Sequence, residues 1–368
     1  MSSGQDVTFH NFAGADFTEE LEAVRRVLDS GWLILGDEVR RFEQAWAARC
    51  GVGNAVGVGN GLDAIEVGLR GLGIGPGDEV ITTSMTAVAT VLAVIRAGAI
   101  PVLADIDPQT GLLDSVSVER CIGPRTRAVL LVHLYGQMRD MDRWSDLCRS
   151  RGVLLLEDCA QSHDARFDGR RGGGWGSFGA YSFYPTKNLG AVGDAGILVT
   201  DDDDLAVLAA SLRNYGQSNR YEHPHVGLNS RMDEVQAAIL SVRLSRLAAW
   251  TARRRQIAEN YRAGINNPAV NLLNPPASPE RHVNHLFVTL TPHRTQLQAH
   301  LAGLGVETLI HYPIPAHRQT SLASVRRDPQ GLVASEAHSE QCLSLPCAPH
   351  LTDEMVERVI SAVNKFHS

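Results

Sequence analysis

The chain has 368 residues, of which 44% are hydrophobic and 20% charged, and its formal net charge at pH 7 is −7. This composition is typical of a soluble globular protein of about two domains, and the negative charge argues against a general nucleic-acid surface. The six cysteines show no C-x-x-C and no zinc spacing, and the first residues lack the basic and apolar regions of a signal peptide. We therefore expect free thiols, no metal site, no membrane association and a cytoplasmic protein.

The first half of the chain alternates between helical patterns and short apolar runs. Helical periodicity at 16–30 and 37–50 precedes a series of strands that we expect at 54–58, 79–83, 100–104, 127–133 and 153–157. The helices between them are expected to end near 72 and to span 86–97, 115–121 and 140–151. This alternation predicts an α/β fold with a mostly parallel sheet and helices on both of its faces.

A glycine-rich junction follows the first of these strands. Gly59-Asn60-Gly61-Leu62-Asp63 leads from the strand into a helix. The first N–H groups of a helix are free and its dipole is positive there, so the junction suits a phosphate. Glycines that only form a tight turn would give the same pattern.

An aspartate stands at the end of the strand at 153–157. Ligands of open α/β sheets bind at the carboxyl ends of the strands, and a carboxylate there can keep a ring nitrogen protonated. Asp158 is the candidate, with a helix N-cap as its alternative role.

A lysine lies in the run from Tyr181 to Gly190, among aromatic, hydroxyl and glycine residues. Pro185 argues against a helix, so we expect Lys187 on a constrained turn after a short strand. A partly desolvated lysine can act as an amine nucleophile on a carbonyl, although most lysines are simply exposed. Together with Asp158 and the phosphate junction, Lys187 provides the protein's part of pyridoxal phosphate (PLP) chemistry.

The rest of the chain changes character. We expect a strand at 196–200, a helix after the acidic run at 201–204, a long functional loop at 213–231 and helices from 232 to 263. A strand near 285–290, a helix near 294–304, a strand near 306–310 and a final helix at 352–366 follow. We therefore predict a large cofactor-binding domain at 1–250, including the N-terminal helices, and a smaller C-terminal α/β domain at 251–368.

Seven motifs distributed over nearly the whole chain resemble the DegT/StrS family of sugar aminotransferases, which have the aspartate-aminotransferase fold (fold type I). They are Gly59–Ala64, Gly73–Val80, Val132–Gln137, Glu157–His163, Ser182–Gly190, Gly227–Arg231 and His311–His317. Several are long and individually specific. The resemblance implies a PLP-dependent transferase fold with a large and a small domain.

The resemblance also implies roles for individual residues. Lys187 would form the Schiff base with PLP and then carry the proton, Asp158 would pair with the ring nitrogen, and Gln161 would bind the ring hydroxyl. The implied phosphate ligands are Ser182, the backbone of Gly61 and Leu62, and, from the neighbouring subunit of a homodimer, Asn229. The candidates for lining the sugar site are His163, Tyr184, His311 and Tyr312.

Two residues depart from the family pattern. Many members have threonine where this chain has Leu62, so one hydroxyl toward the phosphate is missing. Many also have an aromatic residue where Ala87 stands, and that ring stacks on the pyridine. Stacking is worth about 0.5–1.5 kcal/mol, so the cofactor is held less tightly or another residue covers that face.

The implied reaction is a transamination in amino-sugar biosynthesis. L-glutamate would donate the amine, and a keto-sugar linked to a nucleoside diphosphate would accept it. Asn-Gly-Leu-Asp at 60–63 and His-Tyr-Pro-Ile-Pro at 311–315 resemble the motifs of members that aminate C3 of a deoxy-keto-sugar more than those that aminate C4. The alternatives are a 4-keto sugar, a cyclitol ketone, another carbonyl sugar, or a non-catalytic sensor of the same fold. A dehydratase is disfavoured because Lys187 is present.

Overall fold

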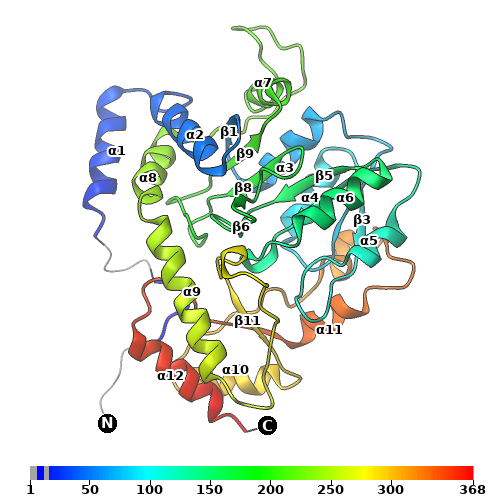
Figure 1. The fold of residues 1–368 in the computed structure, drawn as a ribbon. Coiled ribbons are helices and arrows are strands. Elements are labelled where there is room, and N and C mark those ends of the chain that lie inside the picture. Colours follow the sequence, from blue (N-terminus) through cyan, green and yellow to red (C-terminus); the bar gives the residue numbers. More distant parts are fainter. Residues whose placement is uncertain (1–5, 12–15, 368) are drawn as a thin grey trace.

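The central feature of the molecule is one large sheet. The computed structural model describes residues 6–11 and 16–367, and within them eight strands form this sheet (Figure 1). Strand β9 runs antiparallel to both of its neighbours, whereas all other neighbouring pairs are parallel. The strands in spatial order are β1 (Asn54–Val58), β9 (Gly196–Thr200), β8 (Gly179–Ser182), β5 (Leu154–Asp158), β4 (Thr126–Val132), β2 (Glu79–Thr83), β3 (Ile100–Ala104) and β12 (Arg326–Arg327). This arrangement confirms the predicted mostly parallel sheet.

Both faces of the sheet are buried under helices. In β4, Ala128 and Leu130 belong to one core cluster, and Val129 and Leu131 belong to another. Alternate residues of a strand point to opposite faces, so the continuous apolar run of β4 reflects burial on both sides. The first cluster includes residues of α3 (Gly61–Gly71), α4 (Val88–Arg96) and α7 (Asp203–Leu212), and the second includes residues of α5 (Ser115–Cys121) and α6 (Met141–Arg151).

The N-terminal helices pack beside the sheet. These helices, α1 (Thr18–Ser30) and α2 (Asp37–Cys50), both contact α8 (Glu234–Leu244) from later in the chain. The buried carboxylate of Glu234 accepts hydrogen bonds from the backbone N–H groups of Gly36 (2.7 Å), Glu38 (2.8 Å) and Val39 (3.0 Å). These donors lie at the start of α2, where a helix leaves its N–H groups without internal partners. Glu234 therefore fixes α2 against α8.

The C-terminal part builds a second, smaller sheet around its own core. The long helix α9 (Leu247–Gly264) leads into this part in Figure 1. Its elements are β10 (Asn271–Leu272), β11 (Phe287–Leu290), β13 (Cys342–Leu345), α10 (Arg294–Gly303), α11 (Val333–Gln341) and α12 (Asp353–Asn364). The predicted domain boundary at 250 falls inside α9, and β12 from this part joins the large sheet. The division at 250 stays a prediction.

Most predicted elements occur within two residues of the predicted bounds, but one strand was wrong. Residues 306–310 form only single bridges, Val306 with Val7 and Leu309 with Ser344. The segment at 213–231 has neither helix nor strand and protrudes beside α7 in Figure 1. A two-residue hairpin pair, β6 (Arg166–Phe167) and β7 (Arg170–Arg171), was not anticipated. None of the helices in the described part of the chain combines the length and apolar character that a membrane crossing requires.

Candidate active site

The lysine of the predicted site lies on a tight turn after β8. The strand ends at Ser182, and within the turn the N–H of Lys187 donates to the carbonyl of Tyr184 (2.8 Å). A side chain at Gly190 would place its Cβ 2.3 Å from the carbonyl oxygen of Pro185. Glycine is thus required where the chain closes back on the turn, and the turn holds the lysine backbone in one place.

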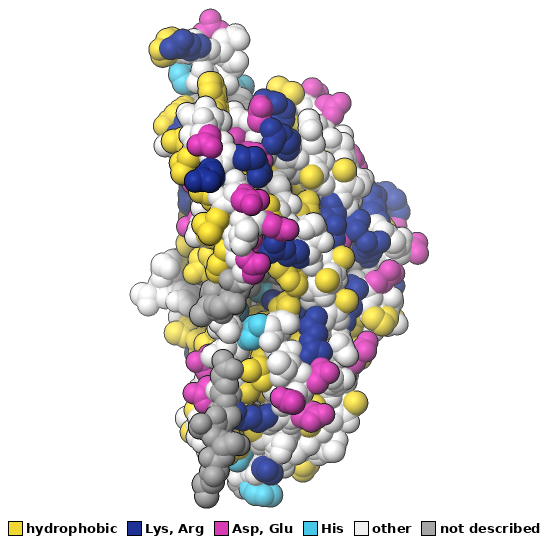
Figure 2. Space-filling view, turned by 90° about the vertical axis from the view of Figure 1, so that its left-hand side faces the viewer, with side chains coloured by type: hydrophobic (Ala, Val, Ile, Leu, Met, Phe, Trp, Pro, Cys, Tyr) yellow, Lys and Arg dark blue, Asp and Glu magenta, His cyan; other side chains and the backbone are white. Residues whose placement is uncertain are grey.

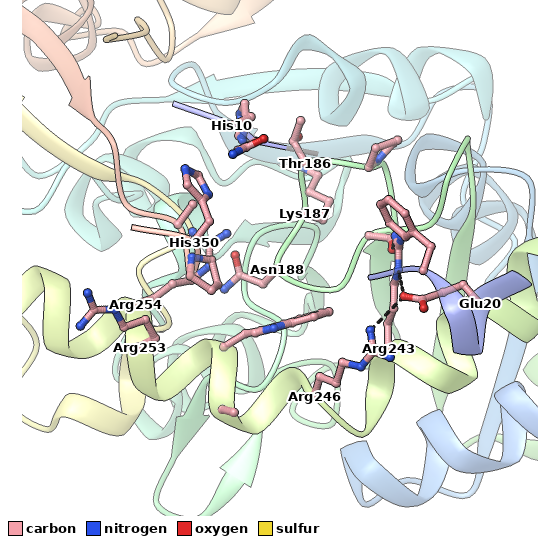
Figure 3. A pocket seen from close by; sticks show the side chains of 18 of the residues that line it. His10, Glu20, Thr186, Lys187, Asn188, Arg243, Arg246, Arg253, Arg254 and His350 are labelled. Carbon is pink, nitrogen blue, oxygen red and sulfur yellow. Dashed lines mark hydrogen bonds and ion pairs between the residues drawn. The ribbon is translucent and has the colours of Figure 1, made fainter. Parts of the chain in front are cut away.

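The surroundings of Lys187 weaken its basicity. Burial lowers the pKa of Lys187 from 10.5 to about 8, and the nearby carboxylate of Asp158 acts in the opposite direction. Figure 3 shows the lysine extending from its turn into a cavity of about 410 Å³. Among the site residues predicted from the sequence, all of which lie in the described part of the chain, only Lys187 lines this cavity. An amine with such a pKa is partly neutral near pH 7.5 and can act as a nucleophile.

Asp158 lies buried at the carboxyl end of β5, as predicted. Its Oδ2 accepts a hydrogen bond from the hydroxyl of Thr90 (2.8 Å), and its Oδ1 accepts one from the N–H of Ala160 (3.1 Å). An ionised carboxylate can accept about four hydrogen bonds, so these two contacts orient Asp158 and leave capacity for a ring N–H.

The neighbouring Glu157 ties the end of β5 to the backbone of residues 173–176. Its buried carboxylate accepts hydrogen bonds from the N–H groups of Gly173, Trp175 and Gly176 and contacts Nε2 of His133 at 2.9 Å. The ligand atoms of His133, Glu157 and Cys159 all lie within 4.8 Å of one another, as in a metal site. Both oxygens of Glu157 are already engaged, so we interpret this cluster as structural.

The glycine-rich junction and the end of β8 meet. A Cβ added to Gly61 would lie 2.7 Å from the Cβ of Ser182, which is closer than real side chains approach. Asn60 caps the helix by accepting from the N–H of Asp63 (2.9 Å). The start of α3, with Gly61 and Leu62 as its first residues, therefore lies against the Ser182 side chain and forms a small cradle for an anion.

Gln161 is held by two contacts that set the orientation of its amide. Its Oε1 accepts a hydrogen bond from the N–H of Tyr135 (2.6 Å), and its Nε2 donates to the hydroxyl of Tyr312 (3.2 Å). Tyr135 adopts a positive φ of 61°. Because the amide nitrogen carries two hydrogens, Gln161 keeps one of them for a ligand.

The comparisons with known proteins decide the family. The model of the DegT/DnrJ/EryC1/StrS aminotransferase family matches residues 15–364. The chain belongs to this family. One relative is the dTDP-3-amino-3,4,6-trideoxy-alpha-D-glucose transaminase of Streptomyces venezuelae, which is 46% identical over 94% of this chain and 91% of that protein. The dTDP-3-amino-3,6-dideoxy-alpha-D-galactopyranose transaminase of Aneurinibacillus thermoaerophilus is 44% identical over 94% of each chain.

A solved structure supports the same assignment. The crystal structure of S. venezuelae DesV in complex with a ketimine intermediate matches with a TM-score of 0.94 and 44% sequence identity, covering 98% of each chain. As a member of the DegT/DnrJ/EryC1/StrS aminotransferase family, the protein is a PLP-dependent aminotransferase with the fold of these enzymes. The predictions of family, fold class, enzyme class and cofactor are thereby confirmed.

The described residues fit PLP. The cradle of Gly61 and Ser182 suits the phosphate, Asp158 suits the ring nitrogen, and the free N–H of Gln161 suits the ring hydroxyl. Lys187 stands close enough to Asp158 for their charges to interact. One sheet edge thus brings together four groups that the sequence predicted separately.

The predicted sugar-site residues are in different environments. The His163 ring is fully buried against Trp46, and burial lowers its pKa to about 3. Tyr184 is 51% exposed. Nδ1 of His311 lies 2.8 Å from the hydroxyl of Ser344, and the partly buried Tyr312 contacts Gln161. Two of these four are joined to predicted cofactor ligands by hydrogen bonds: Tyr312 accepts from the amide of Gln161, and the backbone N–H of Tyr184 donates to the hydroxyl of Ser182 (3.3 Å).

The remaining predicted positions lie at the margins of the site. Asn229 is exposed on the protruding segment and pairs with Asn214 in a single bridge. Leu62 packs partly buried against the core under α3, and Ala87 immediately precedes α4. Sequence reasoning missed Thr90, whose only signal was its place one helical turn after Thr86, to which its hydroxyl bonds at 2.9 Å.

Proposed function

We propose that the protein transfers an amino group from L-glutamate to C3 of a nucleotide-linked 3-keto-deoxysugar. The observation that carries this proposal is the similarity, over 94% of the chain, to two transaminases whose names place the amine at carbon 3 of a dTDP-sugar. The choice of L-glutamate rests on the family resemblance alone. The reaction belongs to amino-sugar biosynthesis.

The chain's own residues divide the work. PLP, when bound, supplies the electron sink. Asp158 keeps the ring nitrogen protonated, because an adjacent negative charge favours the cationic form. Gln161 donates its remaining amide N–H to the ring hydroxyl, and Ser182 with the start of α3 binds the phosphate. Lys187 Nζ anchors the cofactor between turnovers and moves the proton, a role that its lowered pKa of about 8 supports.

The sugar site follows from the same geometry. Tyr312 contacts Gln161, and burial raises its pKa to about 12, so its hydroxyl stays protonated and can donate to the sugar. His311 and the exposed Tyr184 complete the proposed lining. His163 is buried beneath the lysine turn among aromatic rings, so we propose that it supports the turn and does not contact the sugar directly.

We also propose a homodimer with shared active sites in the cytoplasm. Asn229 is exposed in the single chain, as a residue that reaches the phosphate of a neighbouring subunit must be. On the side that carries α1, hydrophobic side chains gather on the surface below the protruding loop (Figure 2). Leu21, Leu28 and Trp32 are each more than 60% exposed there. The six cysteines are buried free thiols, which fits a reducing compartment.

The proposal is tested with purified protein and defined substrates. The PLP absorbance band should bleach on addition of L-glutamate, and the amine form should then convert a dTDP-linked 3-keto-6-deoxyhexose. Lys187→Ala should lose turnover, whereas Lys365→Ala, the control at the chain's second lysine, should retain it. Conversion of the 4-keto isomer or a cyclitol ketone in place of the 3-keto sugar would refute the C3 assignment. Cofactor binding without any turnover would favour a sensor.

A further inference from the structure

The residue after the lysine is tied to a segment far away in the chain. Asn188 is buried; its Nδ2 donates to the carbonyl of Val283 (3.2 Å), and its Oδ1 lies 3.0 Å from Nδ1 of His285. The amide nitrogen is committed to a carbonyl, so Oδ1 must accept, and His285 carries its hydrogen on Nδ1. Both side-chain ends of Asn188 are thus attached to one short segment, 283–286, which we call the clasp.

The clasp also holds the loop that orients Gln161. The N–H of Val283 donates to the carbonyl of Gly136 (3.0 Å), and the N–H of Leu286 donates to that of Tyr135 (3.4 Å). The N–H of Tyr135 in turn donates to Oε1 of Gln161. A Cβ on Gly136 would meet Val283 at 2.7 Å, so the two segments are in close contact. The clasp therefore bonds to the turn of Lys187 on one side and to the support of Gln161 on the other.

The clasp is itself rigidly held. Asn284 is buried with a positive φ of 45°, and a non-glycine residue persists in that conformation only where its surroundings enforce it. The guanidinium of Arg254, buried in α9, donates to the carbonyls of Asn284 (3.4 Å), His285 (3.3 Å) and Cys347. By donating to these backbone carbonyls, Arg254 fixes the path of the chain where the clasp meets the lysine turn.

We propose that the clasp sets the position of Lys187 relative to Gln161, and that Asn188 and His285 are positioning residues for transamination. The inference rests on the proposed function, because both groups are expected to act on one cofactor. A misplacement of about 1 Å in an active site can cost about 100-fold in rate. Neither positioning residue needs to touch the cofactor to have this effect.

The chain offers a direct probe of this idea, because Lys187 and Lys365 are its only lysines. Reductive methylation of the full chain, freed of cofactor, with ¹³C-formaldehyde places an NMR label on each lysine and on the N-terminus. The Lys187→Met protein identifies the Lys187 signal by its absence. In the wild type this signal should titrate near pH 8, and the signal of Lys365, which is exposed near the C-terminus, serves as the internal reference for the labelling.

Four variants test the clasp. Asn188→Ala and His285→Ala should loosen the turn, admit water to the lysine and raise the pKa of Lys187 by about one unit or more. With cofactor and substrates restored, their kcat should fall about 10- to 100-fold while KM for the sugar changes little. His285→Asn keeps a donor where Nδ1 stood and should restore most of both properties. Thr289→Val removes one buried hydrogen bond of β11 and serves as the matched control.

The outcomes separate this inference from the proposed function. An unchanged pKa of Lys187 and unchanged kcat in Asn188→Ala would overturn it, as would an equal loss in Thr289→Val. If Asn188→Ala does not fold, His285→Ala, which keeps Asn188 and removes only the partner of its Oδ1, should give the same direction of change. A wild type that turns over no keto-sugar would refute the proposed function while the NMR titration still reports on the clasp.

Discussion

Replacement of Lys187 by methionine tests the electrostatics of the site most directly. In the protein without cofactor, burial lowers the pKa of Lys187 from 10.5 to about 8, which corresponds to about 3 kcal/mol of folding free energy. This value is an upper limit, because the side chain is only partly buried and water screens part of the effect. Methionine keeps nearly the size of the side chain and removes its titration.

The sign of the effect follows from the two pKa values. Below pH 8 the lysine is charged in both the folded and the unfolded chain, so the folded chain is destabilised by the full cost of burying the charged amine. Between pH 8 and 10.5 the folded chain has lost the proton that the unfolded chain still binds, so wild-type stability rises with pH. Above pH 10.5 both forms are neutral. The stability of Lys187→Met relative to wild type should therefore fall by up to about 3 kcal/mol between pH 7 and 10.5.

Urea unfolding of both cofactor-free proteins between pH 7 and 10.5 measures this difference. Buried cysteines and tyrosines titrate in both proteins, and their contributions cancel in the comparison. Lys365→Met, a substitution at the exposed second lysine, should track the wild type at every pH. A wild type and a Lys187→Met protein with parallel pH profiles would refute the account of Lys187 as a partly buried amine of lowered pKa.

Three further substitutions test the supports of the site. Gly61→Ala forces a methyl group against Ser182 and should weaken cofactor binding, measured as the PLP dissociation constant, by about 1–3 kcal/mol; an unchanged constant would contradict the cradle. Thr90→Val removes a hydrogen bond to the ionised Asp158 and should lower kcat/KM about 10-fold or more with unchanged circular dichroism, and full activity would contradict it. Glu234→Ala strands three N–H groups at the start of α2 and should destabilise the protein by about 2–4 kcal/mol, seen as a lower Tm.

A glycine outside the site provides the control for Gly61. No atom lies within 4 Å of a Cβ added to Gly303, in the last turn of α10, and its φ is not positive. Gly303→Ala should therefore leave cofactor binding unchanged and stabilise the protein by about 0.5–1 kcal/mol, because alanine restricts the unfolded chain.

Elements with a strong local pattern were predictable from sequence, and elements that depend on a distant partner were not. The strand at 79–83 lies between a Gly-Pro-Gly turn and a helix, and its predicted bounds are those of β2. The stretch at 306–310, Val-Glu-Thr-Leu-Ile, looked equally suitable as a strand. It meets its neighbours only in single bridges, Val306 with Val7 and Leu309 with Ser344. Pairing over several residues, and not composition, decides whether such a stretch is a strand.

The site divides in the same way. Lys187 and Asp158 can be recognised from the residues next to them. Lys187 is a lone charge in a glycine-rich turn, and Asp158 follows an apolar strand. The hydrogen bond from Thr90 to Asp158 spans 68 residues, and the contact between Asn188 and His285 spans 97. No feature of a single sequence relates such distant positions. The groups that we propose for the chemistry were therefore visible in the sequence, whereas the residues that we propose to position them were not.

The sheet register explains why the predictable groups converge. Strands β5 and β8 are parallel neighbours, with Asp158 opposite Ala180, so Asp158 and Ser182 leave the sheet at the same edge. Strand β9 runs antiparallel between β8 and β1, and Gly196 at its start packs against Asn60, which brings the beginning of α3 to that edge. The sheet and the packing on β9 thus bring Asp158, Ser182 and the start of α3, the proposed ligands of the ring and the phosphate, to one edge. Lys187 lies on a turn beyond the last paired residue of β8, where the ladder no longer constrains it, and for that reason its position depends on the clasp from the C-terminal part of the chain.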